Sequence, residues 1–145
     1  MTSMVRAQGH VQIRCTPAQA FAVLADPTQV PSWRPDVLEA SPLVGRGVGA
    51  RYVETIAFFG RKSQTFEVMC HEPERRIVVR AVDGLGLRPT QSFCLEPDGS
   101  TTRLSYDIEL PVSGWFLAMK PLLGKMIPSK WAQYADKLRA KLEAG

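Results

Sequence analysis

Two side chains in the middle of the chain could exchange protons with a bound molecule. Tyr106 alternates with Leu104 and Ile108 along one strand-like segment, so its hydroxyl shares their inward side. Glu54 lies in a second such segment and points inward if Tyr52 does. A carboxyl group held in apolar surroundings has a raised pKa and can act as an acid or a base. We treat Tyr106 and Glu54 as the catalytic candidates; an ordinary core tyrosine and a surface glutamate are the alternatives left open.

The histidines and cysteines do not fit a catalytic or metal-binding pattern. His10 and His71 both fall on the outward phase of predicted strands, and no serine lies in a nucleophile-elbow sequence. Their separation matches no zinc motif. Cys15, Cys70 and Cys94 are isolated from one another, as expected for reduced thiols. We expect no metal and no cofactor.

A glycine-rich segment, 45–50, superficially resembles a dinucleotide-binding loop. Such a loop joins a strand to a helix, whose N-terminus receives the pyrophosphate. Here the glycines lead instead into the strand-like segment 50–59. We therefore interpret 45–50 as a flexible connection between strands.

The elements that would position these groups are mainly strands. We predict them over 10–15, 37–44, 50–59, 62–72, 75–82, 87–96 and 101–110, with Pro97-Asp98-Gly99 as the clearest hairpin turn. In 62–72 the alternation places Phe66, Val68 and Cys70 on one face. Thr16 and Pro17 are typical of a helix start, so two short helical segments, 17–25 and 26–33, follow the first strand. Residues 111–114 should end the sheet.

One long amphipathic helix is predicted for the end of the chain. Its apolar face consists of residues at spacings of three and four: Leu123, Ile127, Trp131, Tyr134, Leu138 and Leu142. Pro128 removes a backbone hydrogen bond, so we expect a kink between Gly124 and Pro128. A helix is about 10–12 Å across, whereas six or seven strands make a sheet roughly 30 Å wide. The sheet must curl around the helix or leave a hollow, which predicts an α+β fold with an internal apolar cavity.

We expect this cavity to lie between the inward side of the strands and the apolar face of the helix. Its predicted lining is Tyr52, Glu54, Phe66, Val68, Val79, Gln91, Phe93, Leu104, Tyr106, Ile108, Trp115, Phe116, Met119, Leu123, Ile127 and Trp131. The irregular segment 115–128 is where we expect the ligand to enter, with the loop 83–86 as an opposing lid.

Composition excludes several classes of protein. The 145 residues are enough for one domain, which we expect to span 1–145. The net charge of +4 comes from scattered basic residues without interleaved aromatic residues, so we expect no nucleic acid partner. The chain has neither an apolar leader nor an apolar run long enough for a transmembrane segment. A cytoplasmic location is the expectation.

The order of elements resembles the helix-grip (SRPBCC, START-like) superfamily, which includes START domains, birch-pollen-type allergens and polyketide cyclase/dehydrase proteins. The resemblance is carried by VQIRCTPAQAFAVLADPTQVPSW, FEVMCHEPERRIVVR and DKLRAKLEA, with Asp26, Pro27 and Trp33 at family-like positions. It implies a curved antiparallel sheet of about seven strands around a long C-terminal helix. It also implies a cavity for lipids, sterols or aromatic polyketides. Because members range from carriers to enzymes and share no short catalytic signature, it assigns no catalytic residue.

Three functions remain open on these grounds. The leading hypothesis is a protein that binds a hydrophobic or aromatic small molecule, such as a lipid or polyketide, in the internal cavity. The second is a cyclase/dehydrase-type enzyme that uses the same cavity, with Tyr106 and Glu54 exchanging protons. The third is an interaction module whose basic helix makes weak contact with an anionic membrane or with another protein. Either a monomer or a homodimer is compatible with the sequence.

Overall fold

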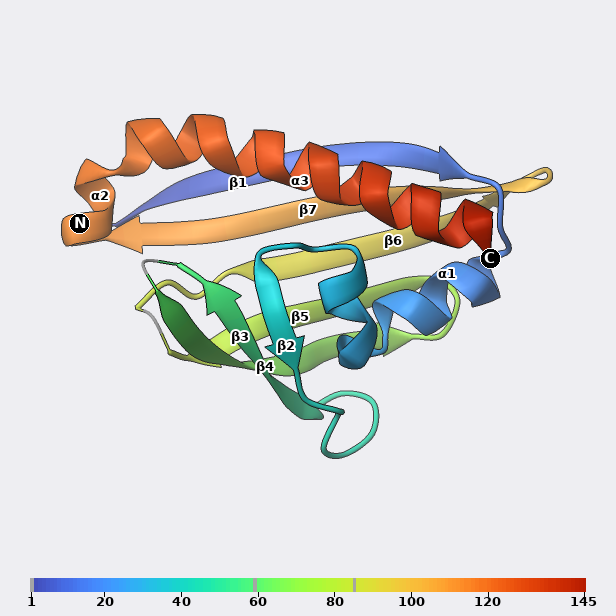
Figure 1. Ribbon diagram of the computed structural model, residues 1–145, viewed down its shortest axis with the longest axis horizontal. Coiled ribbons are helices and arrows are strands. Elements are labelled where there is room, and N and C mark those ends of the chain that lie inside the picture. Colours follow the sequence, from blue (N-terminus) through green and yellow to red (C-terminus); the bar gives the residue numbers. More distant parts are fainter. Residues whose placement is uncertain (1, 59, 85) are drawn as a thin grey trace.

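A curved antiparallel sheet holds the long C-terminal helix against one of its faces (Figure 1). The computed structural model describes residues 2–58, 60–84 and 86–145. The strands are β1 (Thr2–Ile13), β2 (Val37–Ala40), β3 (Arg51–Ala57), β4 (Arg61–Glu72), β5 (Arg76–Asp83), β6 (Thr90–Asp98) and β7 (Thr101–Ser113). They are ordered β1-β7-β6-β5-β4-β3-β2. The helices are α1 (Pro17–Leu24), the 3-10 helix η1 (Pro27–Ser32), α2 (Trp115–Ala118) and α3 (Lys120–Ala144).

Strand β7, which carries Tyr106, has the alternation of inward and outward side chains that its sequence predicts. Its inward residues Leu104, Tyr106, Ile108 and Leu110 are all buried. The strand continues to Ser113, however, so the prediction that 111–114 end the sheet is wrong. β6 begins opposite Glu109, and beyond that point β1 is the one partner of β7 among the described strands. A proline such as Pro111 is tolerated where a strand lacks a second neighbour.

Strand β1 is also longer than predicted, because it begins at Thr2 and not at His10. It pairs with β7 along its whole length, from Thr2 opposite Ser113 to Ile13 opposite Thr102. Strand β2 is shorter than the predicted segment 37–44. Two residues of predicted elements, Phe59 and Leu85, lie outside the described residues.

A β-bulge changes which side chains of β4 face inward. Val68 pairs with Val79, but Cys70 pairs with Val78, so one extra residue is inserted at Met69. After this shift His71, and not Cys70, shares the inner face with Val68. The predictions that Cys70 lies on that face and that His71 points outward are therefore wrong. His71 is half-buried, and its ring meets that of Phe21 edge-on at 5.3 Å.

Local capping explains where the two short helices start. The Thr16 hydroxyl accepts the backbone N–H of Gln19, and the Gln19 side chain accepts the backbone N–H of Thr16. This capping box satisfies two N–H groups that the helix leaves free. Asp26 caps η1 in a similar way by accepting the backbone N–H of Thr28 at 3.1 Å. The short helices therefore form at the predicted positions.

Helix α3 continues through Pro128 without interruption (Figure 1). A break in helical structure lies earlier, at Met119, between α2 and α3. Residues on both sides of Pro128, Leu123 and Trp131, are buried. Because tertiary packing supplies most helical stability, this burial outweighs one lost backbone bond. None of the helices in the described ranges is long and apolar enough to cross a lipid bilayer.

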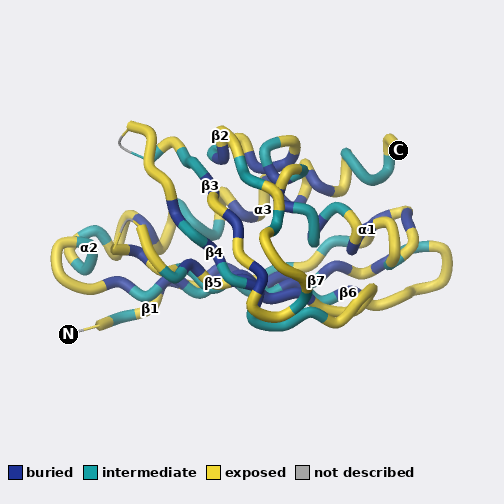
Figure 2. Tube along the Cα trace, turned by 90° about the horizontal axis from the view of Figure 1, so that it is seen from below, coloured by how far each residue is buried: buried dark blue, intermediate teal, exposed yellow. Residues whose placement is uncertain are grey.

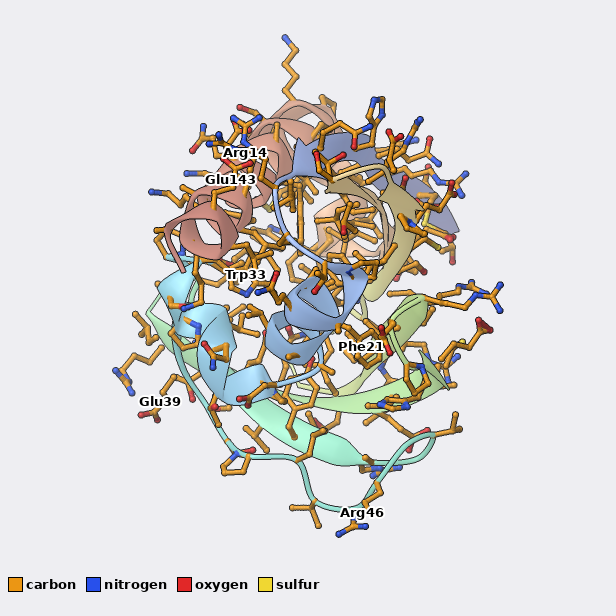
Figure 3. All side chains as sticks on the ribbon, turned by 90° about the vertical axis from the view of Figure 1, so that its right-hand side faces the viewer. Arg14, Phe21, Trp33, Glu39, Arg46 and Glu143 are labelled. Atoms are coloured by element: carbon orange, nitrogen blue, oxygen red, sulfur yellow. The ribbon has the colours of Figure 1, made fainter. Side chains whose placement is uncertain are left out.

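The far end of α3 is fastened to the segment between β1 and α1. Arg14 donates its backbone N–H to Glu143 at 3.0 Å, and the side chains of the two residues form an ion pair at 3.4 Å. Figure 3 shows this pair together at the end of α3, whereas Glu39 and Arg46 point outward from the opposite edge.

Two apolar clusters divide the interior. The larger one joins α1, η1, the middle of the sheet and the second half of α3, including Trp131 and Leu138. The smaller one contains Val5, Leu87, Leu110, Val112 and Leu123. Figure 2 shows the buried positions along the inner side of the strands and along α3. The first half of α3 therefore contacts a different cluster from the second half.

Candidate ligand-binding cavity

A cavity of about 590 Å³ lies between the sheet and α3, bordered by residues of both apolar clusters. It is lined by Arg34, Pro35, Asp36, Ile56, Ala57, Phe58, Gln64, Phe66, Leu87, Pro89, Gln91, Ile108, Leu110, Met119, Leu122, Met126, Ile127, Lys130, Trp131, Gln133 and Tyr134. Its volume falls within the range of small-molecule pockets, roughly 300–1,000 Å³. The predicted hollow between sheet and helix is thus present.

The helix side of the cavity is lined by adaptable apolar side chains. Met119 and Met126 are half-buried, and Trp131 is buried at the inner end. Leu122 is 58% exposed, and Lys130 is exposed as well, so these two residues lie where the cavity meets solvent. Methionine adjusts its shape to irregular ligands more easily than branched residues do.

The sheet side contains one polar residue in an apolar row. Ala7, Ile108, Gln91, Val79 and Val68 are successive cross-strand partners on five strands. Four of these side chains are apolar, and all five are buried. Gln91 is therefore a polar interruption at the middle of the wall that faces α3.

The two glutamines of the wall differ in their partners. Gln64 donates its side-chain amide to the carbonyl oxygen of Leu87 at 2.8 Å. The Gln91 side chain makes no hydrogen bond to any residue in the ranges 2–58, 60–84 and 86–145, although it is only 5% exposed. The Gln91 amide atoms are not among the fully buried polar atoms that lack a partner, so the amide is accessible from the cavity. It can hydrogen-bond to whatever fills that space.

A charged cluster lies at the inner end of the cavity, beside Trp131. Its members Arg34 and Glu54 are buried, whereas the Asp36 side chain is 30% exposed. Arg34 follows η1, Asp36 precedes β2, and Glu54 lies on β3. The Nη2 atom of Arg34 is 3.0 Å from Oδ2 of Asp36, and its Nη1 atom is 3.6 Å from Oε1 of Glu54. The guanidinium carbon lies 4.9 Å from the ring centre of Trp131 and 5.6 Å from that of Tyr134. The two terminal nitrogens of Arg34 therefore face carboxylates of the protein, whereas its Nε atom and Oδ1 of Asp36 have no hydrogen-bond partner among the described residues.

The ionisation of this cluster is strongly shaped by burial. Burial raises the pKa of Glu54, and the nearby Arg34 offsets only part of that effect. For Arg34, burial lowers the pKa, but the charges of Glu54 and Asp36 outweigh it and raise the pKa overall. Burial, followed by the charge of Asp36, raises the pKa of Tyr134 to about 12. Arg34 thus remains a cation, and its charge favours the ionised form of Glu54 against the opposing effect of burial.

A second, much smaller cavity of about 20 Å³ lies behind the cluster. Trp33 and Glu54 are among its lining residues, and Arg34 and Gln91 line both cavities. Within the described part of the chain, neither the indole N–H of Trp33 nor either carboxylate oxygen of Glu54 has a hydrogen-bond partner. A space of this size accommodates a single water molecule. Arg34 and Gln91 therefore form the partition between a ligand-sized space and a water-sized one.

The structure divides the predicted lining residues into three groups. The large cavity is lined by six of them: Phe66, Gln91, Ile108, Met119, Ile127 and Trp131. The small cavity is lined by Tyr52, Glu54, Val68, Val79 and Phe93, and again by Gln91. Leu104, Tyr106, Trp115, Phe116 and Leu123 line neither cavity.

The two catalytic candidates are not brought together at the large cavity. Glu54 does point inward, but it contacts the small cavity behind Arg34. Tyr106 also points inward, and its side chain leans over Gly9, its partner on β1. A Cβ atom at Gly9 would lie only 2.5 Å from the Tyr106 hydroxyl oxygen. This packing keeps the Tyr106 hydroxyl away from the ligand-sized space.

Three polar residues of the site, Arg34, Asp36 and Tyr134, were not predicted to line the cavity. Tyr134 belonged to the apolar face of the predicted helix, but it was interpreted only as part of that face. The signal for Arg34 and Asp36 was weaker, namely a charged pair beside Trp33 in a segment rich in proline. Their meeting with Glu54 depends on how η1 packs against β2, the neighbour of β3 in the sheet, which a local pattern does not contain.

Comparisons with known proteins agree with this architecture. Residues 4–143 match the model of a family described as polyketide cyclase/dehydrase and lipid transport. The structure of Zhui aromatase/cyclase from Streptomyces sp. R1128 superposes with a TM-score of 0.80 at 13% identity, covering 97% of this chain and 94% of that one. A START superfamily protein from Mycobacterium smegmatis superposes with a TM-score of 0.78 at 18% identity, covering 96% and 97%.

A plant enzyme has the same arrangement of elements. Norcoclaurine synthase from Thalictrum flavum superposes with a TM-score of 0.71 at 16% identity, covering 98% of this chain and 96% of that one. A search of curated protein sequences found no match. At such low identities the three structures establish the fold alone, and they confirm the predicted helix-grip architecture.

Proposed function

Because this chain belongs to the polyketide cyclase/dehydrase and lipid transport family, we propose that it binds an apolar or aromatic small molecule between the sheet and α3. The observation that carries the proposal is the 590 Å³ cavity, whose walls are mostly apolar and whose polar lining residues include Arg34, Asp36 and Tyr134 beside Trp131. Few, convergent polar groups in an apolar pocket are typical of small-molecule sites.

The aromatic residues at the inner end favour a ligand with flat rings. Trp131 lines the cavity and lies 6.0 Å from Phe93 and 6.2 Å from Trp33, measured between ring centres. Aromatic rings attract one another at such separations in edge-on or offset arrangements. A planar ligand entering past Met119 and Met126 would therefore extend an existing aromatic cluster.

A neutral fluorescent probe, N-phenyl-1-naphthylamine, tests this proposal. We expect it to bind one-to-one, with increased probe fluorescence and quenching of Trp131. The variant Met126→Trp places a large ring in the cavity and should abolish binding, whereas Lys137→Trp adds the same ring on the exposed side of α3 and should not. Equal probe binding by both variants, or none by the wild type, would contradict the proposal.

A cyclase-type enzyme is the second candidate, favoured by the contact between Tyr134 and Asp36. Both residues line the cavity, and the charge of the Asp36 carboxylate contributes to the raised pKa of Tyr134, so the two groups lie near each other. A neighbouring hydroxyl and carboxylate can move a proton to or from a bound molecule. This pair replaces Tyr106 and Glu54 as our catalytic proposal, because it borders the ligand-sized space.

The enzymatic candidate is tested with a compound that co-purifies with the protein and is identified by native mass spectrometry. Conversion of that compound would be followed by chromatography with mass detection in wild type, Tyr134→Phe and Asp36→Asn. Loss of turnover with retained binding in both variants would support catalysis. Unchanged turnover in both would remove this pair from the mechanism.

A further inference from the structure

We propose that Gln91 is the hydrogen-bonding anchor of the cavity and that the ligand presents an uncharged hydroxyl or carbonyl group to it. This inference rests on the proposed binding function and deepens it by naming the ligand's polar group. The side chain of Gln91 lies in an apolar row of five strands and borders both cavities. It is the polar group of the sheet wall that has no partner within the described ranges.

The Gln91 amide is accessible from the cavity and has no hydrogen-bond partner among the described residues. Its hydrogen bonds must therefore be made to whatever fills the cavity, either water or a ligand. Its neighbours in the row, Ile108 and Val79, offer no polar atoms in their side chains. A ligand oxygen beside Gln91 would supply the missing hydrogen bond. A leucine or methionine would fill the same space if packing alone were required.

The carboxylates around Arg34 disfavour an anionic ligand at the inner end of the cavity. Arg34 is the cation nearest the inner end, but its two terminal nitrogens already face Asp36 and Glu54. A carboxylate beside it would approach the Asp36 carboxylate, since both residues line the same cavity. Like charges in a partly desolvated site repel strongly. The charged cluster therefore disfavours a carboxylate or phosphate at this end.

The guanidinium of Arg34 disfavours a cationic ligand at the same end. The aromatic faces that would attract a cation, those of Trp131 and Tyr134, are already occupied by the guanidinium of Arg34. A second cation would meet that guanidinium. With both charges disfavoured, a neutral oxygen is the group that matches Gln91.

Lys130 provides the alternative that the experiment must distinguish. It lines the cavity where α3 meets solvent, and its side chain is exposed. An anionic ligand in the reverse orientation would place its charge beside Lys130 and its apolar end beside Gln91. Such a ligand would depend on Lys130 and not on Gln91.

Four pyrene derivatives of matched size test the inference: 1-methylpyrene, 1-pyrenemethanol, 1-pyrenecarboxylate and 1-pyrenemethylammonium. In the wild type we expect the carboxylate and the ammonium to bind at least about tenfold more weakly than the alcohol, because burying a charge is costly. The variant Gln91→Met keeps the side-chain length and removes the hydrogen bond. It should weaken alcohol binding about fivefold to tenfold relative to its effect on 1-methylpyrene, the range expected for one neutral hydrogen bond.

The controls separate failure of the anchor from failure of the binding function. Gln12→Met makes the same exchange at an exposed position of β1, outside both cavities, and should change neither affinity. Gln91→Leu serves as a second variant if Gln91→Met does not fold.

If 1-methylpyrene binds but Gln91→Met affects it and the alcohol equally, the anchor is refuted while cavity binding stands. Tighter binding of either charged derivative, or carboxylate binding that Lys130→Gln abolishes, also refutes the anchor. Absence of 1-methylpyrene binding refutes the proposed function itself.

Discussion

Replacing Arg34 with methionine should destabilise the protein far more than removing an exposed ion pair. Arg34 and Glu54 have side-chain exposures of 8% and 1%, and their charged atoms are 3.6 Å apart. Two unit charges at that separation interact by about 5 kcal/mol at an effective dielectric constant of about 20. Removing one partner of a buried pair typically costs about 3–5 kcal/mol, because the other charge is left without compensation. We expect a loss in this range for Arg34→Met near neutral pH.

A double variant tests whether that loss arises from the uncompensated carboxylate. Arg34→Met combined with Glu54→Met replaces the pair by apolar groups of similar length, which is often nearly neutral. We expect the double variant to regain most of the loss and to unfold within about 2 kcal/mol of the wild type. The exposed pair between Arg6 and Asp107, at 2.9 Å, is the matched control, and Arg6→Met should cost much less than Arg34→Met.

The pH dependence of the Arg34→Met loss provides an independent check. Without the guanidinium, the pKa of Glu54 should rise further above its ordinary value of 4.5. A carboxyl group whose pKa is higher in the folded state lowers stability as pH rises from the unfolded pKa towards the folded one. The destabilisation should therefore be smaller at about pH 5 than at about pH 7.5.

Urea unfolding followed by tryptophan fluorescence measures these free energies. The reasoning would be refuted by an Arg34→Met loss below about 1 kcal/mol, by a double variant no more stable than Arg34→Met, or by a loss that grows at acid pH.

Three further predictions concern the framework and a fourth concerns the site. Gly9→Ala should destabilise the protein by about 1–3 kcal/mol in urea unfolding, because the new Cβ atom would lie 2.5 Å from the Tyr106 hydroxyl. Gly124→Ala, where a Cβ atom would meet nothing within 4 Å, should instead stabilise α3 by about 0.5–1 kcal/mol; a loss there would contradict the open space. Thr16→Ala should cost about 1 kcal/mol in the same assay through loss of the capping box, and Thr16→Ser should restore it. In an alkaline ultraviolet titration Tyr134 should ionise near its pKa of about 12, so stability should fall between pH 10 and that value because the unfolded tyrosine ionises first; Tyr134→Phe should reduce this fall.

Residues whose role depends on local alternation were predictable from the sequence. The inward positions of β7 and the apolar face of α3 follow from periods of two and of three to four residues. Those periods led to the helix-grip fold, which the comparisons confirm. For Glu54 the sequence left two orientations open, inward and outward, and the structure has the inward one.

Features that depend on pairing between distant segments were not predictable in this way. The bulge at Met69 turns His71 to the inner face of the sheet, and no residue type in this segment predicts a bulge. The hydroxyl of Tyr106 packs against Gly9 because the register of β1 against β7 places the two residues opposite each other. Arg34 belongs to the site because η1 ends where Glu54 of β3 and Trp131 of α3 can both reach it. Each of these requires the tertiary structure.

The pairing of β1 with β7 has a consequence for how the chain folds during synthesis. β1 leaves the ribosome well before β7, its neighbour in the described sheet, which is about 100 residues further along, as the contact of Arg6 with Asp107 illustrates. Pairings over such separations form slowly, because the intervening loop must close first. Until β7 emerges, Val5, Ala7 and Ile13 remain without the sheet that buries them, and exposed strands of this kind are prone to aggregate. The strand that is made before all the others is therefore among the last to become protected.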